Sequence, residues 1–220
     1  MPRPRASRAI ENALGRWGFA RIAGVDEVGR GSLAGPVMAG AVVLDPEHHI
    51  PGLRDSKVLS AAERERLCRE IMRHGLGWSV ATVEPAEIDR VNIHRASLQA
   101  MRQALLGLVP LPDLALVDAF RIPGLPIAQR GVVHGDARSA SIAAASIVAK
   151  VLRDRLMSEL HASDPRYGFD RHKGYATPEH LRALSTYGYS AAHRRSFRPA
   201  SLFDAVENAA GTAEDTPSDR

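Results

Sequence analysis

Three carboxylates stand at the ends of two apolar segments of this sequence. Asp26 and Glu27 close the segment 21–27, and Asp118 follows the apolar residues 114–117. If these segments are neighbouring parallel strands, their ends lie only ~5 Å apart and the carboxylates meet at one edge of the sheet. At that separation, two like charges repel by roughly 3 kcal/mol at an effective dielectric constant of 20. Such a cluster needs cations or protons.

The chemistry of these side chains favours a hard cation. All three offer oxygen and no His or Cys stands beside them, which suits Mg²⁺ or Mn²⁺ better than zinc. Two divalent ions held ~3.5–4 Å apart by carboxylates recur in phosphodiester hydrolysis, where one activates water and the other stabilises the leaving 3′ oxygen. One question stays open. Adjacent strand residues point to opposite faces, so a regular strand does not let both Asp26 and Glu27 reach one metal pair.

A glycine-rich segment follows the first two carboxylates. Gly29, Gly31 and Gly35 do not fit a dinucleotide-binding fingerprint, because the third glycine falls one place late and Pro36 leads into a strand. The segment also lacks the Gly-Lys-Ser/Thr of a phosphate loop. A glycine-lined turn beside carboxylates can instead bring backbone N–H and C=O groups close to a sugar or phosphate.

The apolar pattern predicts the elements that position these residues. Strands are predicted at 21–27, 37–44, 78–83, 114–117 and, more weakly, 126–134. Helices are predicted from Ser60 (a capping box with Glu63), at 85–90 and 92–107, from about Ser139, and after Thr177. This order predicts an α/β fold with a mixed sheet.

Length and composition set the limits of the prediction. The 220 residues, 45% of them hydrophobic, suit one domain with a real core, and the net charge of +4 favours a polyanionic partner without proving one. Cys68 is the only cysteine, which excludes an internal disulfide. No apolar run could span a bilayer, and the chain shows no secretory signal, so we expect a cytoplasmic protein.

Several motifs of this chain resemble those of the ribonuclease HII family, in the family's order over about residues 21–200. The ordered set is far more specific than any one of its members. The motifs are GVDEVGRGSLAGP at 24–36, DSK at 55–57, LVD at 116–118, GD at 135–136, SIAAASIVAK at 141–150, RDR at 153–155, HKGYAT at 172–177 and HRRSF at 193–197.

This resemblance implies a ribonuclease H-like fold, with a five-stranded mixed sheet flanked by helices and a small helical C-terminal part. It implies two-metal hydrolysis, with Mn²⁺ or Mg²⁺, of the RNA strand of RNA–DNA hybrids and of DNA 5′ to single embedded ribonucleotides. The products would carry 5′-phosphate and 3′-hydroxyl ends. We expect a short basic extension at 1–20, the catalytic domain at 21–202 and a disordered tail at 203–220, in a protein that acts as a monomer.

The resemblance also assigns the acidic positions. Asp26, Glu27, Asp118 and Asp136 match the four active-site carboxylates of the family. An alternative role for Asp136 is to cap the following helix. Asp154 is a rival fourth carboxylate, but its arginine neighbours favour an ion pair.

Substrate contacts are assigned in the same way. Gly29, Arg30 and Gly31 match the segment that meets the ribonucleotide 2′-hydroxyl through backbone groups, the group that distinguishes RNA from DNA. Tyr175 matches the tyrosine that packs on the following sugar. Basic residues expected on a duplex-binding face are Lys57, Lys173, Arg138, Lys150, Arg194, Arg195 and Arg198. Departures from the family pattern are Ser32, Val58 and Ala119, and none removes a carboxylate; His172 and His193 are weaker candidates for metal ligands.

Two other classes are weighed against this hypothesis. A non-catalytic nucleic-acid-binding domain could use the basic surface, but it would not need the acidic cluster. A ribonuclease HIII-like hybrid nuclease carries an additional N-terminal substrate-binding domain, whereas only about twenty residues precede the first predicted strand here.

Overall fold

The five predicted strands form one mixed sheet in the computed structural model, which describes residues 6–197. The strand order is β3-β2-β1-β4-β5. β1 pairs antiparallel with β2 and parallel with β4, β2 pairs antiparallel with β3, and β4 pairs parallel with β5. The strands are β1 (Ile22–Val28), β2 (Val37–Val43), β3 (Gly77–Val83), β4 (Leu114–Asp118) and β5 (Ala128–Val132). The α/β mixed sheet predicted from the sequence is confirmed.

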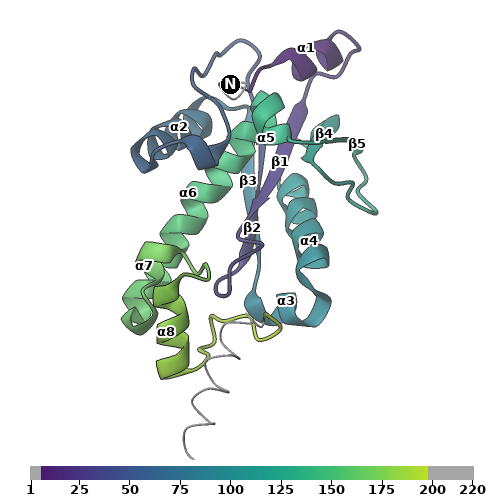
Figure 1. Cartoon of the computed structure of the whole chain (residues 1–220). Helices are drawn as coiled ribbons and strands as arrows, with labels where there is room; N and C mark the ends of the chain where they lie inside the picture. Colours follow the sequence, from purple (N-terminus) through teal and green to yellow (C-terminus); the bar gives the residue numbers. More distant parts are fainter. Residues whose placement is uncertain (1–5, 198–220) are drawn as a thin grey trace, which may run out of the picture.

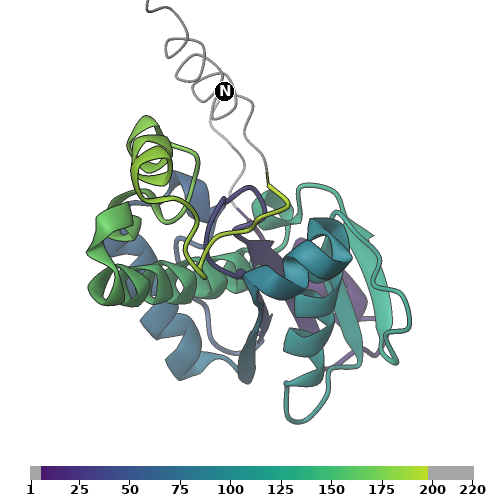
Figure 2. The same ribbon diagram turned by 90° about the horizontal axis from the view of Figure 1, so that it is seen from below.

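Helices cover both faces of this sheet (Figure 1; Figure 2). They are α1 (Ala9–Gly15), α2 (Ala61–His74), α3 (Pro85–Val91), α4 (Ile93–Leu106), α5 (Gly135–Arg138), α6 (Ala140–Ser163), α7 (Phe169–His172) and α8 (Pro178–Tyr187), with short 3-10 turns at η1 (Ser56–Val58) and η2 (Pro165–Tyr167). α4 packs on one face, and α6 with α2 packs on the other. The capping box at Ser60 is confirmed: its backbone N–H donates to Glu63, whose N–H donates back to the Ser60 hydroxyl.

The alanine-rich start of α6 lies unusually close to the sheet. A Cβ atom at Gly24 would lie 2.1 Å from the backbone carbon of Ser141, and one at Gly40 would lie 2.6 Å from the carbonyl oxygen of Ala145. Only glycine leaves room for this approach. The small residues on both sides explain how a chain with 5% aromatic residues fills its core, and they place the α6 backbone directly behind β1.

Helix α1 is an addition to the elements predicted from the sequence. Leu14 is buried beside Ile22 and Leu114, and the buried Glu11 accepts hydrogen bonds from the Ser139 hydroxyl (2.6 Å) and the Ser141 N–H (2.9 Å). A carboxylate at the first turn of α6 is stabilised by the free N–H groups of that helix. Part of the segment 1–20, expected as a plain basic extension, is therefore attached to the sheet and to α6.

The chain after α6 forms a small helical C-terminal part, as the resemblance implies. η2, α7 and α8 pack together around Tyr167 and Phe169. Thr177 caps α8 by accepting from the His180 N–H, and Pro178 occupies the first turn, as predicted. The expected tail at 203–220 and Arg198 lie outside the described residues. Within residues 6–197, no helix has both the length and the apolar character to cross a membrane.

Candidate active site

The ends of β1 and β4 bring Asp26 and Asp118 together. Val25 pairs with Val117 in the parallel ladder, so the next residues along the two strands are neighbours. The Asp118 carboxylate accepts a hydrogen bond from the Gly135 N–H at 2.7 Å. Because Gly135 begins α5, this bond also brings Asp136 to the same edge of the sheet. The structure thus gathers carboxylates that are about a hundred residues apart in the sequence.

Asp136 does not cap the long helix. It lies in the first turn of α5, whereas Ser139 caps α6 by accepting from the Ile142 N–H. Asp154, the rival fourth carboxylate, forms an ion pair with Lys150 at 2.7 Å. Asp136 therefore joins the cluster, and Asp154 belongs to a helix-surface ion pair, as its basic surroundings indicate.

Asp26 and Glu27 occupy opposite faces of the sheet at the end of β1. Asp26 shares a face with Gly24, against α6, while Glu27 follows Val25 on the α4 face. Even so, the charge of Asp118 raises the pKa of both carboxyl groups. Asp26 and Glu27 thus flank the strand end from opposite faces, and Asp118, at the end of the neighbouring strand, is close enough to act on both.

Burial makes this cluster electrostatically strained. Burial, followed by repulsion from Glu27 and Asp118, raises the pKa of Asp26 well above its usual range. Burial also raises the pKa of Glu27, against the opposing effect of Arg30, 3.3 Å away. The pKa of Asp118 is raised by burial and by Asp136, with the Gly135 hydrogen bond acting against them. Ionising Asp26, Glu27 and Asp118 together is therefore unfavourable unless cations are present.

Lys57 supplies one cation from the protein itself. Its Nζ lies 3.7 Å from the Asp136 carboxylate. Burial lowers the pKa of Lys57, but Asp55, Asp136, Asp26 and Asp118 together outweigh burial and raise it. The 3-10 turn that carries Lys57 is fixed to α6 by a hydrogen bond of 2.9 Å between the Ser56 and Ser146 hydroxyls. The predicted basic contact Lys57 thus stands at the carboxylate cluster.

The donor set fits hard divalent cations. Every donor is a carboxylate oxygen, and the buried Glu27 Oε2 has no hydrogen-bond partner among the described residues. Within residues 6–197, no three of these carboxylates bring oxygens within 4.8 Å of one another.

Two buried arginines, Arg153 and Arg194, hold the glycine turn at residues 29–36, a role that their sequence context does not indicate. Arg153 donates to the Pro36 carbonyl (3.0 Å) and the Ser32 hydroxyl (3.0 Å), and Arg194 donates to the Arg30 carbonyl at 2.9 Å. Both arginines are 0% exposed, so the prediction that Arg194 belongs to a duplex-binding surface is wrong. Their contacts fix the path of the turn.

Glycine is required at position 29 by this packing. Gly29 has a φ of +87°, and a Cβ atom there would lie 2.2 Å from Arg153 Nε. Arg30 extends from the turn toward Phe120, with its guanidinium 5.0 Å from the ring centroid, and Gly31 has open space around it. The turn therefore exposes backbone on one side and is anchored by arginine on the other.

Tyr175 lies next to this turn. The Gly174 carbonyl accepts a hydrogen bond from the Leu33 N–H at 2.8 Å, which ties the two segments together. The Tyr175 ring is 37% exposed and lies 5.8 Å from the Arg153 guanidinium. The structure thus places an exposed aromatic ring beside the glycine turn.

A chain of neutral histidines supports the backbone of Tyr175. The Ser190 N–H donates to His193 Nδ1 (3.0 Å), so His193 Nε2 carries the proton and donates to His180 Nε2 (3.1 Å). His180 Nδ1 then donates to the Tyr175 carbonyl (2.9 Å). His172 likewise uses both nitrogens, with Tyr167 and Gly174. These lone pairs are occupied, so the alternative of metal ligation by His172 and His193 is not supported.

This chain predicts a loss of stability in mild acid. Burial, then His180, lowers the pKa of His193 to about 4, whereas the unfolded chain binds that proton near 6.5. Since the unfolded state takes up the proton first, the free energy of unfolding should fall as pH drops from about 6.5 to about 4, by on the order of 2 kcal/mol. Urea denaturation from pH 7.5 to 4.5 measures it.

The raised pKa of Asp26 makes the free energy of unfolding change with pH in the opposite direction. A variant that lacks His193 is therefore needed to isolate the histidine contribution. His193→Asn should flatten the pH dependence relative to the wild type, and the exposed His49→Ala should leave it unchanged. Equal slopes for the wild type and His193→Asn would contradict the assignment.

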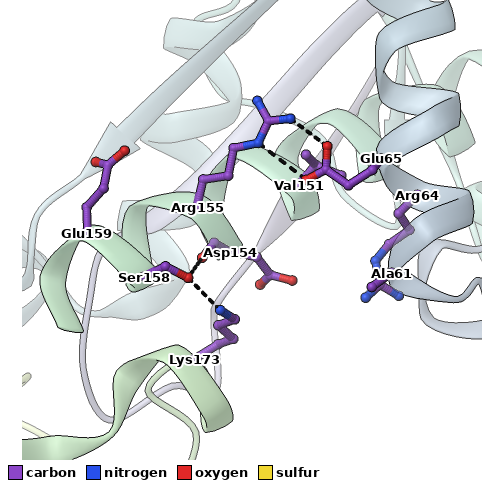
Figure 3. A pocket seen from close by; sticks show the side chains of 9 residues that line it. All are labelled: Ala61, Arg64, Glu65, Val151, Asp154, Arg155, Ser158, Glu159 and Lys173. Atoms are coloured by element: carbon purple, nitrogen blue, oxygen red, sulfur yellow. Dashed lines mark hydrogen bonds and ion pairs between the residues drawn. The ribbon is translucent and has the colours of Figure 1, made fainter. Parts of the chain in front are cut away.

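Lys173, the second predicted basic contact, lines a surface hollow of about 410 Å³ between α2 and α6 (Figure 3). Its Nζ donates to the Ser158 hydroxyl at 2.8 Å. Arg64 and Arg155 line the same hollow, and Arg155 is paired with Glu65 (Figure 3). The hollow carries both signs of charge, and Lys173 faces it rather than the carboxylate cluster.

The sheet order, the flanking helices and the acidic strand ends define a nuclease with the ribonuclease H-like fold. The crystal structure of ribonuclease H2 from Pyrococcus horikoshii OT3 is similar, with a TM-score of 0.71 and 27% identity over 86% of this chain and 98% of that chain.

The particular family follows from the sequence. The family model described as ribonuclease HII matches residues 23–200, and the chain belongs to this family. Ribonuclease HII of Burkholderia pseudomallei (strain 668) is 56% identical over 81% of this chain and 83% of the relative. That of Syntrophobacter fumaroxidans is 54% identical over 92% and 88%. The chain is therefore an endonuclease with ribonuclease H activity, of a family that depends on divalent metal ions.

Proposed function

We propose that this enzyme hydrolyses the RNA strand of RNA–DNA hybrids and cuts on the 5′ side of single ribonucleotides embedded in duplex DNA. The observation that carries the proposal is the convergence of the carboxylates at the ends of β1 and β4, beside a glycine turn and an exposed tyrosine. The acidic cluster supplies hydrolysis, and the turn with the tyrosine supplies recognition.

In this proposal Asp26, Glu27, Asp118 and Asp136 hold two Mg²⁺ or Mn²⁺ ions. When bound, the ions supply Lewis acidity for the attack of water and for departure of the 3′ oxygen, which leaves a 5′-phosphate and a 3′-hydroxyl. The Gly135 N–H keeps the Asp118 carboxylate oriented. Lys57, within reach of Asp136, contributes positive charge where a scissile phosphate would approach the cluster.

Recognition is assigned to backbone groups and one ring. Gly29, Arg30 and Gly31 present backbone to the ribonucleotide 2′-hydroxyl, and Arg194 holds the Arg30 carbonyl so that the turn is rigid before the substrate binds. Tyr175 packs on the sugar that follows. A 2′-hydroxyl on that next sugar disturbs the ring contact, so a ribonucleotide followed by DNA is preferred to continuous RNA.

A panel of three duplexes tests the proposal. The wild type should cut a DNA duplex holding one ribonucleotide, at its 5′ side, and a hybrid with an all-RNA strand, and should leave an all-DNA duplex intact. Cleavage should require Mg²⁺ or Mn²⁺ and stop with EDTA. An enzyme that cuts the hybrid but ignores the single ribonucleotide would refute the junction preference and behave like the ribonuclease HIII alternative.

The same three duplexes test the role of the Tyr175 ring in recognising the sugar. Tyr175→Ala should lower kcat/KM at the single ribonucleotide about tenfold, or ~1.4 kcal/mol, and lower cleavage within the all-RNA strand less. Tyr175→Phe keeps the ring and serves as the matched control, with nearly unchanged selectivity. If Tyr175→Ala reduces both activities equally, the ring has a structural role and does not read the sugar.

A further inference from the structure

Two histidines and a glutamate come together on the side of α2, outside the proposed catalytic cluster. Glu70 and His74 lie one turn apart near the C-terminal end of α2, and His48 comes from the loop that follows β2. All three side chains are partly buried. Within residues 6–197, they are the only three His, Cys, Asp or Glu side chains whose ligand atoms lie within 4.8 Å of one another.

The spacing of these atoms matches metal coordination. His74 Nε2 lies 3.6 Å from Glu70 Oε2. Two ligands that each bind a tetrahedral ion at ~2.0–2.1 Å are about 3.4 Å apart, so this pair needs little movement to share an ion. The His48 and His74 rings stack at a centroid distance of 4.0 Å with 9° between their planes, so His48 lies beside the pair. Because imidazole binds a metal in the plane of its ring, one of the two rings must turn out of the stack to share the ion.

The surroundings also favour a cation at this place. The C-terminal end of a helix carries partial negative charge, and Glu70 adds a carboxylate. The side chains of His74 and Glu70 are 31% and 43% exposed, so an ion can enter and keep a water molecule as its fourth ligand. An isolated Glu–His pair one turn apart is a common surface ion pair of little energetic value. This cluster differs from such a pair because a third ligand, His48, comes from a loop outside α2.

We propose that His48, Glu70 and His74 form a second metal site, which binds a transition-metal ion of the Zn²⁺ class. Two imidazole nitrogens and one carboxylate oxygen suit Zn²⁺ and disfavour Mg²⁺, whereas the catalytic cluster offers oxygen alone. The two sites therefore select different ions. An ion at this second site joins the β2–η1 loop to α2. That loop runs on into Asp55 and Lys57, so the ion stabilises the segment that leads to the carboxylate cluster.

Zinc titration of the full chain, freed of any histidine tag, tests the site. The titration is done by isothermal calorimetry in about 10 mM Mg²⁺, so that Mg²⁺ occupies the oxygen ligands of the catalytic cluster. Zn²⁺ should then bind at one site in the wild type, with micromolar or tighter affinity. His48→Ala and His74→Ala should each weaken that binding at least tenfold. His49→Ala, a neighbouring exposed histidine outside the cluster, is the matched control and should bind like the wild type.

Thermal unfolding gives a second readout that does not depend on activity. Zn²⁺ should raise the Tm of the wild type and of His49→Ala, and should leave the Tm of His48→Ala unchanged. Asp118→Asn, altered in the catalytic cluster, should keep the Zn²⁺ site, which separates this proposal from the proposed function. Binding that survives in His48→Ala but is lost in Asp118→Asn would overturn the assignment, as would the absence of Zn²⁺ binding by the folded wild type.

Discussion

Replacing Asp118 by Asn is expected to lower cleavage by about 10³-fold or more, which corresponds to ~4 kcal/mol of transition-state stabilisation. The amide keeps the size of the side chain and an oxygen that can accept the Gly135 N–H. It removes a carboxylate whose charge acts on both Asp26 and Glu27. Fold and duplex binding should survive, and single-turnover cleavage with a separate binding assay distinguishes the two effects.

The same variant should be at least as stable as the wild type without metal. Burial raises the pKa of Asp118 above its ordinary 3.8 in the folded protein, so its ionisation opposes folding. The free energy of unfolding should therefore decrease as pH rises from about 3.8 through the raised folded pKa, and Asp118→Asn removes that contribution. Added Mg²⁺ should raise the Tm of the wild type more than that of the variant, because an ion that binds only the folded state stabilises it.

Asp154→Asn is the matched control for this prediction. Asp154 lies on α6, outside the carboxylate cluster, and is paired with Lys150. Its replacement should leave cleavage within about twofold of the wild type. If Asp154→Asn abolished cleavage and Asp118→Asn did not, the choice of the fourth carboxylate and the proposed mechanism would both be wrong.

The sequence predicts the sheet and its acidic edge because the decisive signals are local. β1, β2 and β4 are short apolar runs that end at a carboxylate or a turn, and the parallel neighbours β1 and β4 bring Asp26 and Asp118 together without further information. The start of α2 is predicted equally well by the capping box of Ser60 and Glu63. Asp136 could be assigned only by resemblance, since its position depends on the long-range hydrogen bond between Gly135 and Asp118.

The support of the glycine turn could not be predicted in this way. Arginine is normally exposed, and nothing local distinguishes Arg153 or Arg194 from the arginines beside them. Apart from the Ser32 hydroxyl, their partners are backbone carbonyl groups, which leave no trace in the sequence. The histidine chain behind Tyr175 is similar, because the proton arrangement that holds it follows from contacts between separate segments. For α1, the apolar pair Ile10 and Leu14 is a signal that could have identified the helix.

Arg153→Ala is expected to destabilise the protein by about 3–5 kcal/mol. The guanidinium is buried and has no carboxylate partner among residues 6–197, and it satisfies the carbonyl groups of Pro36, Lys173 and Ala34. Truncation leaves these buried acceptors without their donor, and each unpaired buried group costs about 1–3 kcal/mol. The measurement is chemical denaturation of both proteins at one pH.

Arg155 offers a matched control two residues along the same helix. Its side chain is 50% exposed and forms an ion pair with Glu65, so Arg155→Ala should change stability by less than about 1 kcal/mol. Equal destabilisation by the two substitutions would mean that the buried carbonyl contacts of Arg153 contribute nothing beyond helix propensity. Because Arg153 holds the turn that begins at Gly29, kcat/KM of Arg153→Ala should also fall under conditions where the variant remains folded. Arg153→Lys should not restore kcat/KM, since an ammonium group cannot donate along the three directions in which the guanidinium fork reaches the turn.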